Sequence, residues 1–130
     1  MSAVSSFWDL YLQLGGTTGP FNSVETRRRL RQRTAGPELG RLYDVFESNA
    51  AAGVVVKGTV DIAPSVVSIA GTTALVRDCF DDNTGLYRIS DGQRLDSNDP
   101  RRHQVLITLT DTAGMWKVSA MQDEGLGCAA

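Results

Sequence analysis

Histidine, cysteine and long apolar runs are scarce in this 130-residue sequence, and each scarcity excludes a class of protein. One histidine and two cysteines, with neither CxxC nor HxH spacing, do not make a zinc site. The longest apolar stretches, residues 50–56 and 62–69, are interrupted and fall short of the roughly 18–20 residues that cross a bilayer. We therefore expect no metal site, no cofactor and no transmembrane segment.

An excess of basic over acidic residues is also lacking in the sequence as a whole. The formal net charge is −2. Up to residue 43 the sequence has six arginines and three acidic residues, whereas the remainder has seven basic and twelve acidic residues. Neither part has the charge of a nucleic-acid-binding protein, so we expect no nucleic-acid partner. The run Arg27–Arg33 is typical of a solvated helix face, and a phosphate or an anionic membrane surface is its alternative partner.

The overall composition is that of an ordinary globular protein. Hydrophobic residues form 42% of the sequence and charged residues 22%. A chain of 130 residues has the common size of one domain with one core. We expect a single domain over residues 1–130.

Apolar periodicity predicts three helices in the first part of the chain. The first spans residues 6–15, with a capping serine at its start. The second begins after Asn22, whose spacing to Glu25 is that of a capping box. Pro37 suits the first turn of the third helix, which Gly53 ends.

After residue 53 the apolar period changes to two, which is the period of strands. Turn signals predict hairpins at residues 70–71, 91–92 and 111–114. A strand that begins at Thr73 is expected to end at Phe80. The polar residues 81–83 lack the spacing of a calcium loop and are interpreted as a solvated hairpin end.

This order of elements predicts an α+β fold. Three N-terminal helices should pack on a curved, mostly antiparallel sheet of five to six strands. We expect Trp116 and Val118, on the last strand, to be buried beneath the third helix. A strongly curved sheet with helices across its mouth would enclose a cavity.

The order of elements resembles the nuclear-transport-factor-2-like superfamily, the cone-shaped (SnoaL/ketosteroid-isomerase-like) fold. An aromatic first helix, a long third helix entering a valine-rich strand, and the closing segment Gly114–Val118 carry the resemblance over about residues 5–125. The resemblance implies the fold better than the function, because this fold hosts both enzymes and inert adaptors.

Three segments, Val76–Asp82, Trp116–Val118 and Glu124–Cys128, are similar to small actinobacterial envelope proteins and lipoproteins of unknown role. This resemblance implies a disulfide between Cys79 and Cys128, the alternative being two free thiols. It also implies an extracytoplasmic protein, secreted or held at the cell envelope. The first residues lack the basic and apolar regions of a secretory signal, so we expect the leader to be absent from this sequence. A cytoplasmic protein is the alternative.

Our first functional hypothesis is a non-enzymatic accessory domain that binds a protein partner or a small apolar ligand in or beside its cone. Four aromatic side chains would line or seal the cavity: Trp8, Tyr11, Phe46 and Trp116. A homodimer that pairs through the open face of the sheet is a further hypothesis.

The competing hypothesis is an isomerase, cyclase or hydrolase that acts on a hydrophobic molecule in the cone. Such chemistry needs a carboxylate base and a tyrosine or protonated acid inside an apolar cavity. The candidates are Tyr11, Asp78 and His103, with Asp9 as a second choice of carboxylate. Strand alternation places Arg77 on the face opposite Asp78, so these groups do not all point inward.

Overall fold

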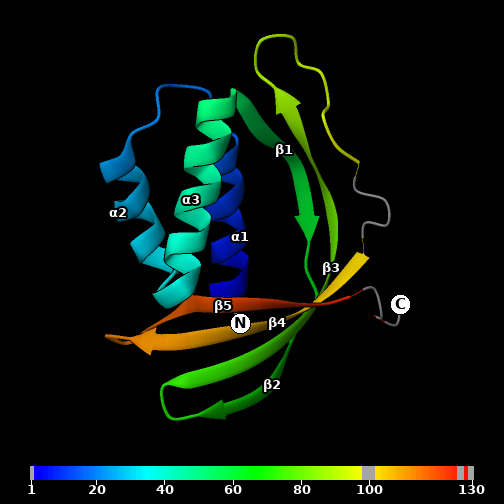
Figure 1. Ribbon diagram of the computed structural model, residues 1–130. Helices are drawn as coiled ribbons and strands as arrows, with labels where there is room; N and C mark the ends of the chain where they lie inside the picture. The colour runs from blue at the N-terminus through cyan, green and yellow to red at the C-terminus, as the bar shows by residue number, and fades with distance from the viewer. Residues whose placement is uncertain (1, 98–101, 126–127, 129–130) are drawn as a thin grey trace.

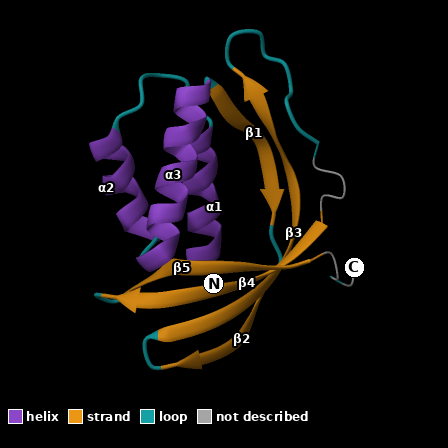
Figure 2. Ribbon diagram, viewed as in Figure 1, coloured by secondary structure: helices purple, strands orange, loops and turns teal. Residues whose placement is uncertain are grey.

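In the computed structural model, which describes residues 2–97, 102–125 and 128, three helices precede five strands and form a separate layer (Figures 1 and 2). The helices are α1 (Ser2–Gly15), α2 (Ser23–Arg33) and α3 (Gly36–Ala52). The strands are β1 (Val54–Asp61), β2 (Pro64–Ala70), β3 (Thr73–Arg88), β4 (Arg102–Thr112) and β5 (Met115–Gly125). The predicted α+β fold, with its helices first and an antiparallel sheet after them, is confirmed.

The first helix begins at Ser2, one turn earlier than predicted. Val4 is fully buried and lies one turn before the buried Phe7, so the apolar stripe that packs on the core starts ahead of Ser6. Tertiary packing of such a stripe supplies most of the stability of a short helix. Ser6 therefore lies inside α1 and the predicted cap at this residue is wrong.

The capping residues of the other helices lie where the sequence predicted them. Asn22 is extended, and its side-chain oxygen accepts a hydrogen bond from the backbone N–H of Glu25 at 3.0 Å. Pro37 stands in the first turn of α3. Gly53 follows this helix with a φ of 69°, a left-handed conformation that glycine adopts without strain.

The long strand β3 organises the sheet, whose order is β1-β3-β4-β5 with β2 also beside β3. The first half of β3 pairs with β2 and its second half with β1, while β4 pairs with residues 73–81 from the other side. Figure 1 shows β1 and the end of β3 running beside the helices, whereas β2, β4 and β5 cross below them. The sheet bends around the helical layer on two sides.

The predicted end of a strand at Phe80 is wrong, because β3 continues to Arg88. Residues 81–83, interpreted from sequence as a solvated hairpin end, lie inside this strand and pair with β1. Polar partners on β1 accommodate them: the side-chain amide of Asn83 donates a hydrogen bond to the carboxylate of Asp61 at 3.1 Å. In the sequence, polar residues that hydrogen-bond to a neighbouring strand cannot be distinguished from the polar residues of a turn.

Two of the predicted turns are present in altered form. The chain turns at Gly92, which has a φ of 72°, but in the described residues the flanking segments form only an isolated bridge, between Tyr87 and Arg94. The β4–β5 hairpin is tighter than residues 111–114, because Ala113 and Gly114 alone make its turn. Both have positive φ, 54° and 84°, as a two-residue type I′ turn requires.

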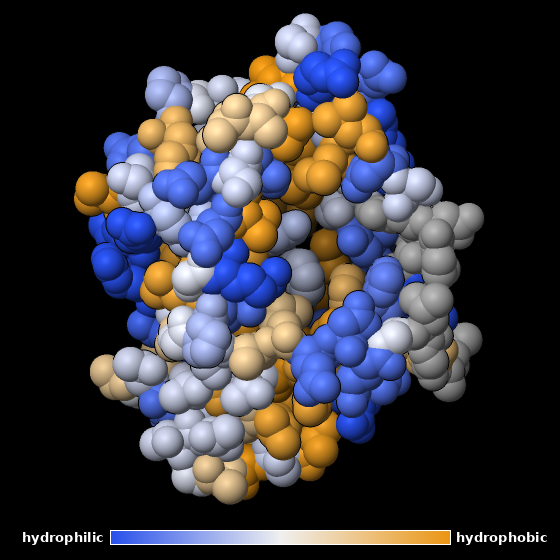
Figure 3. Space-filling view, in the orientation of Figure 1, coloured by the Kyte–Doolittle hydropathy of each residue, from blue (hydrophilic) through white to orange (hydrophobic). Residues whose placement is uncertain are grey.

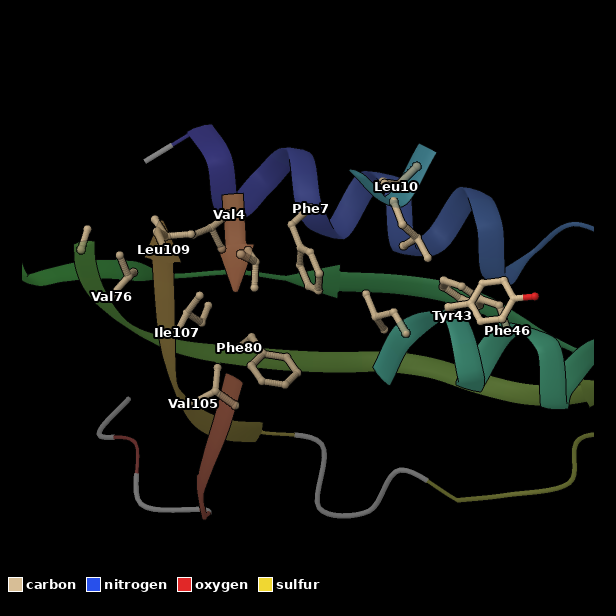
Figure 4. Packing of buried hydrophobic residues seen from close by; sticks show 14 residues of the cluster. Val4, Phe7, Leu10, Tyr43, Phe46, Val76, Phe80, Val105, Ile107 and Leu109 are labelled. Atoms are coloured by element: carbon tan, nitrogen blue, oxygen red, sulfur yellow. The ribbon is translucent and has the colours of Figure 1, made fainter. Parts of the chain in front are cut away.

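Apolar side chains of the helices and of the central strands fill the space between the two layers (Figure 4). Phe7 of α1, Val76 of β3 and Ile107 of β4 are at most 1% exposed. Val118 is fully buried, as predicted, and its carbonyl accepts a hydrogen bond from the N–H of Ala35, just before α3, at 3.0 Å. Trp116 was predicted to be buried with it but is only partly buried, because it pairs close to the β4–β5 turn, at the rim of the core.

Candidate functional site

Aromatic rings from four elements stand in one row through the molecule. Trp8 of α1 lies 5.4 Å from Tyr11 and 5.2 Å from Phe80 of β3, between ring centroids. Tyr11 lies 5.7 Å from Phe46 of α3, and Phe80 lies 5.7 Å from His103 of β4. We call these five residues the aromatic row. Such centroid distances are those of favourable aromatic pairs.

Three of the four aromatic residues predicted to line a cavity therefore contact one another, and Trp116 is outside their row. Trp116 is on β5 and packs against the edge of the core. The indole Nε1 of Trp8 is buried and has no hydrogen-bond partner among the described residues. Phe46 is itself 5% exposed, so most of its surface packs against protein atoms.

Tyr11 borders a groove of about 220 Å³ between the helices and the β1–β3 side of the sheet. In Figure 3 the surface is hollowed between α3 and these strands, with apolar and polar residues on its walls. Asp82 and Asp96 also line this groove. Burial raises the pKa of the Tyr11 hydroxyl above its usual value, and the carboxylate of Asp82 raises it further. The hydroxyl is therefore a neutral donor at physiological pH.

Asp78 is completely enclosed by protein. One carboxylate oxygen, Oδ1, accepts a hydrogen bond from the backbone N–H of Ala63 at 2.8 Å, and Oδ2 has no partner among the described residues. Burial raises the pKa of this carboxyl above its usual value, and the Ala63 hydrogen bond only partly opposes that effect. Asp78 belongs to the core beneath the β1–β2 corner and does not line the groove.

His103 stacks on the ring of Phe80, with its Nδ1 3.7 Å from a carboxylate oxygen of Asp123. Arg77 faces away from Asp78, as alternation predicted, and pairs with Glu124 at 3.0 Å. Asp9 is on the exposed side of α1. The structure thus places the three catalytic candidates, Tyr11, Asp78 and His103, in three different surroundings.

A larger cavity, of about 530 Å³, lies at the far end of the helical layer. We call it the apolar cavity. Its walls come from the end of α1, the loop of residues 17–22, one side of α2, the last turns of α3, and residues 54 and 89. Leu14, Phe46, Ala50 and Ala51 are among its lining residues. Phe21, 36% exposed, closes one side and packs on Tyr43 at 5.8 Å.

Sequence reasoning missed the apolar cavity, apart from Phe46. The wall combines three parts of the chain, within residues 14–29, within residues 46–54 and at residue 89, and no residue pattern in any one of them marks it. One sequence feature could have indicated the cavity: the small residues Ala50 and Ala51 near the end of the third helix. Small side chains on a helix surface leave space beside the helix that larger side chains would fill.

Cys79 and Cys128 form a disulfide, with their Cα atoms 5.8 Å apart. This distance lies within the usual range for a bridge, about 4.4–6.8 Å. Since Cys79 alternates with the buried Asp78 along β3, the bridge is on the face of the sheet that points away from the helices.

Two further properties concern the described residues only. In this part of the chain, no three histidine, cysteine, aspartate or glutamate side chains come together as a metal site requires. None of the helices in the same residues has the length and apolarity needed to cross a bilayer.

The fold is shared with a solved chloroplast domain. The intermembrane space region of the chloroplast protein ARC6 superimposes with a TM-score of 0.69 and 16% sequence identity, over 95% of this chain and 92% of that chain. A domain of unknown function with a cystatin-like fold from Nostoc punctiforme gives a TM-score of 0.49 at 9% identity, over 98% and 75% of the two chains. No protein-family model and no curated protein sequence matches. These comparisons show a fold in common with the ARC6 region, and they do not show the nuclear-transport-factor-2-like assignment.

Proposed function

We propose that this protein is a non-enzymatic accessory domain that binds an apolar group of a small ligand in the apolar cavity. The observation that carries the proposal is the cavity itself, which has a volume of about 530 Å³ and a mostly apolar surface, with polar side chains of the loop, α2 and α3 also in its lining. Small-molecule sites commonly have volumes of roughly 300–1,000 Å³ and this kind of lining. Arg29 and Asn49 are among the polar groups that would orient the ligand.

The enzyme alternative, an isomerase, cyclase or hydrolase, has weaker support. General acid–base catalysis requires the acid and the base to reach one reacting group. Tyr11 lines the groove, Asp78 is enclosed in the core, and His103 lies beside Asp123. Their separate surroundings favour binding over catalysis.

We infer an extracytoplasmic setting, in the cell envelope or secreted. The Cys79–Cys128 disulfide supports it, because such bridges persist in oxidising compartments and are rare in the cytosol. The similar ARC6 region belongs to an intermembrane space, which fits the same inference. Thiol alkylation of the native protein tests the setting: a protein purified from its native compartment with two alkylatable cysteines would return the cytoplasmic alternative to first place.

The finer family assignment is also part of this proposal. We propose that residues 1–130 form one cone-fold domain of the nuclear-transport-factor-2-like type, related to the small actinobacterial envelope proteins and lipoproteins that share its cysteine segments. The helices that precede a bent antiparallel sheet support the cone shape. Solved structures of those envelope proteins would test it, since their disulfide must superimpose on Cys79–Cys128.

Binding of an uncharged fluorescent probe, N-phenyl-1-naphthylamine, tests the proposed function. We expect saturable binding to the native protein. Ala50 and Ala52 are both exposed alanines in the last turn of α3, and of these two only Ala50 lines the apolar cavity. Ala50→Phe should fill the cavity and weaken binding by about tenfold or more, a change of about 1.4 kcal/mol, whereas Ala52→Phe should leave it unchanged.

Equal effects of the two substitutions, or no saturable binding by the native protein, would contradict the proposal. A protein partner that inserts an apolar side chain into the same cavity is the other occupant to consider. In that case, Phe21→Ala would weaken capture of the partner, and the native protein would bind the free probe poorly.

A homodimer through the sheet is a separate proposal, favoured by one observation. Val66, Val67 and Ile69 of the edge strand β2 are 46%, 48% and 57% exposed, on a part of the sheet that the helices leave uncovered. Two such strands could pair across a two-fold axis. Light scattering at high protein concentration that reports only monomer would remove this proposal.

A further inference from the structure

A second concave surface lies at the opposite end of α2 from the apolar cavity. Its volume is about 580 Å³, and its lining comes from the last turns of α2 and the start of β5: Arg28, Arg31, Gln32, Arg33, Met115 and Lys117. We call it the basic depression. These two segments are more than eighty positions apart in sequence, and only the fold brings them together. The arginine run alone therefore did not reveal the basic depression.

Three of the four cations of the basic depression have no carboxylate partner among the described residues. Arg28 is paired with Glu25, with Nε 2.8 Å from the carboxylate. Arg31, Arg33 and Lys117 form no ion pair within the described residues, and no acidic residue is among the six that line the surface. The guanidinium of Arg33 lies against the sulfur of Met115 at 3.7 Å, which holds it at the wall.

The other arginines of the run have different contacts. Arg27 lies 3.9 Å over the ring of Tyr43, and Arg29 donates a hydrogen bond to the side chain of Gln13. Cations in the last turn of a helix are favoured by its dipole, which explains Arg31 and Arg33 without any ligand. The helix dipole does not explain Lys117, which belongs to β5. Its positive charge lies beside those of Arg31 and Arg33, and this repulsion costs free energy.

We propose that the basic depression binds a phosphate group. A phosphate presents at least three acceptor oxygens around one centre, so it can accept from two arginine forks and one ammonium at once. A single carboxylate has one negative charge and two oxygens, so it balances less of the positive charge of the three cations than a phosphate monoester does. The phosphate belongs either to a free phosphorylated small molecule or to the headgroup of an anionic phospholipid. Both present an anionic phosphate to the three cations, with three unesterified oxygens in a monoester and two in the phosphodiester of a phospholipid. This proposal is independent of the apolar cavity.

Binding of inorganic phosphate to the full chain, in a buffer without other oxyanions, tests the proposal by shifts of backbone amide signals in NMR. A second arm measures co-sedimentation with phosphatidylglycerol vesicles against phosphatidylcholine vesicles. The test variant is R31Q/K117Q, and K57Q and a double K57Q/R102Q are its controls. Lys57 and Arg102 lie outside the depression, so the double control removes the same charge from elsewhere. Arg31, Lys57 and Arg102 are exposed and Lys117 is half-buried, so urea unfolding midpoints check that each variant is folded.

We expect R31Q/K117Q to weaken binding by about tenfold or more, which one to two lost charge-assisted hydrogen bonds would produce, and both controls to retain it. Binding of inorganic phosphate that R31Q/K117Q weakens and both controls retain supports a free phosphorylated ligand. Binding to phosphatidylglycerol vesicles alone, with the same dependence, supports a phospholipid headgroup. Equal loss in the double control, no binding in either arm, or tighter binding of an acidic peptide or of single-stranded nucleic acid would overturn the proposal.

Discussion

Removal of the Cys79–Cys128 bridge should destabilise the protein by an amount set by the loop that the bridge closes. The two cysteines are 49 positions apart. In the chain-entropy model, closing a loop of about 50 residues stabilises the folded state by about 4 kcal/mol at 25 °C. This figure is an upper value, because residual structure in the unfolded chain reduces it.

The assay is equilibrium unfolding in urea, followed by the fluorescence of Trp8 and Trp116. With a denaturant slope of about 2 kcal/mol per molar, C128S should lower the midpoint by about 2 M. C79S breaks the same loop but changes a position inside β3, whereas Cys128 lies after the last strand, so C79S serves as the comparison. The native protein should match C128S once it is reduced.

A loss of less than about 1 kcal/mol in C128S would refute the loop argument. A much larger loss in C79S than in C128S would show that packing around Cys79, and not the cross-link, supplies the stability.

Three further predictions concern a glycine of β1, a glycine of α3 and the buried carboxyl of Asp78. Gly58 has a φ of 125°, and a Cβ there would collide with the backbone carbonyl of Asn83, so Gly58→Ala should lower the free energy of unfolding by about 2 kcal/mol or more. Gly40→Ala, in α3 with open space around it, should raise the same quantity by about 0.5–1 kcal/mol; chemical unfolding measures both, and equal signs would contradict the argument. Burial raises the pKa of Asp78 in the folded state, so the folded protein binds this proton more tightly than the unfolded chain does. The resulting stability is present below the ordinary carboxyl pKa and is lost as pH rises through the raised one. The native protein should therefore lose stability relative to Asp78→Asn as pH increases from about 3 to 7. If the free energies of unfolding of the two proteins change with pH in parallel, the prediction is wrong.

Local rules predicted most element boundaries, and tertiary packing decided those that they missed. Asn22 caps the start of α2 and Gly53 caps the end of α3, through a hydrogen bond and a φ value that depend only on residues close in sequence. The start of α1 was missed because it depends on Val4, whose burial requires the sheet. The length of β3 was missed because Asn83 finds its polar partner on β1, more than twenty residues away.

The candidate site was less predictable than the fold. Helical spacing made Trp8 and Tyr11 neighbours, and the row they form with Phe46 followed from the packing of α1 on α3. Cavities, however, are the space that packing leaves between elements, so their position depends on every wall at once. The apolar cavity lies beside the predicted cone, at the end of the helices, and contains only one of the four predicted aromatic residues.

The position of a bound apolar probe tests the central claim most directly. Backbone amide shifts of the full chain should be recorded with and without N-phenyl-1-naphthylamine. We expect the largest changes at the walls of the apolar cavity, in residues 17–22 and at Ala50, Ala51 and Val54, with little change at Asp82 and Thr84 of the groove. Changes concentrated in the groove or along β2, with the walls of the apolar cavity unaffected, would contradict the account.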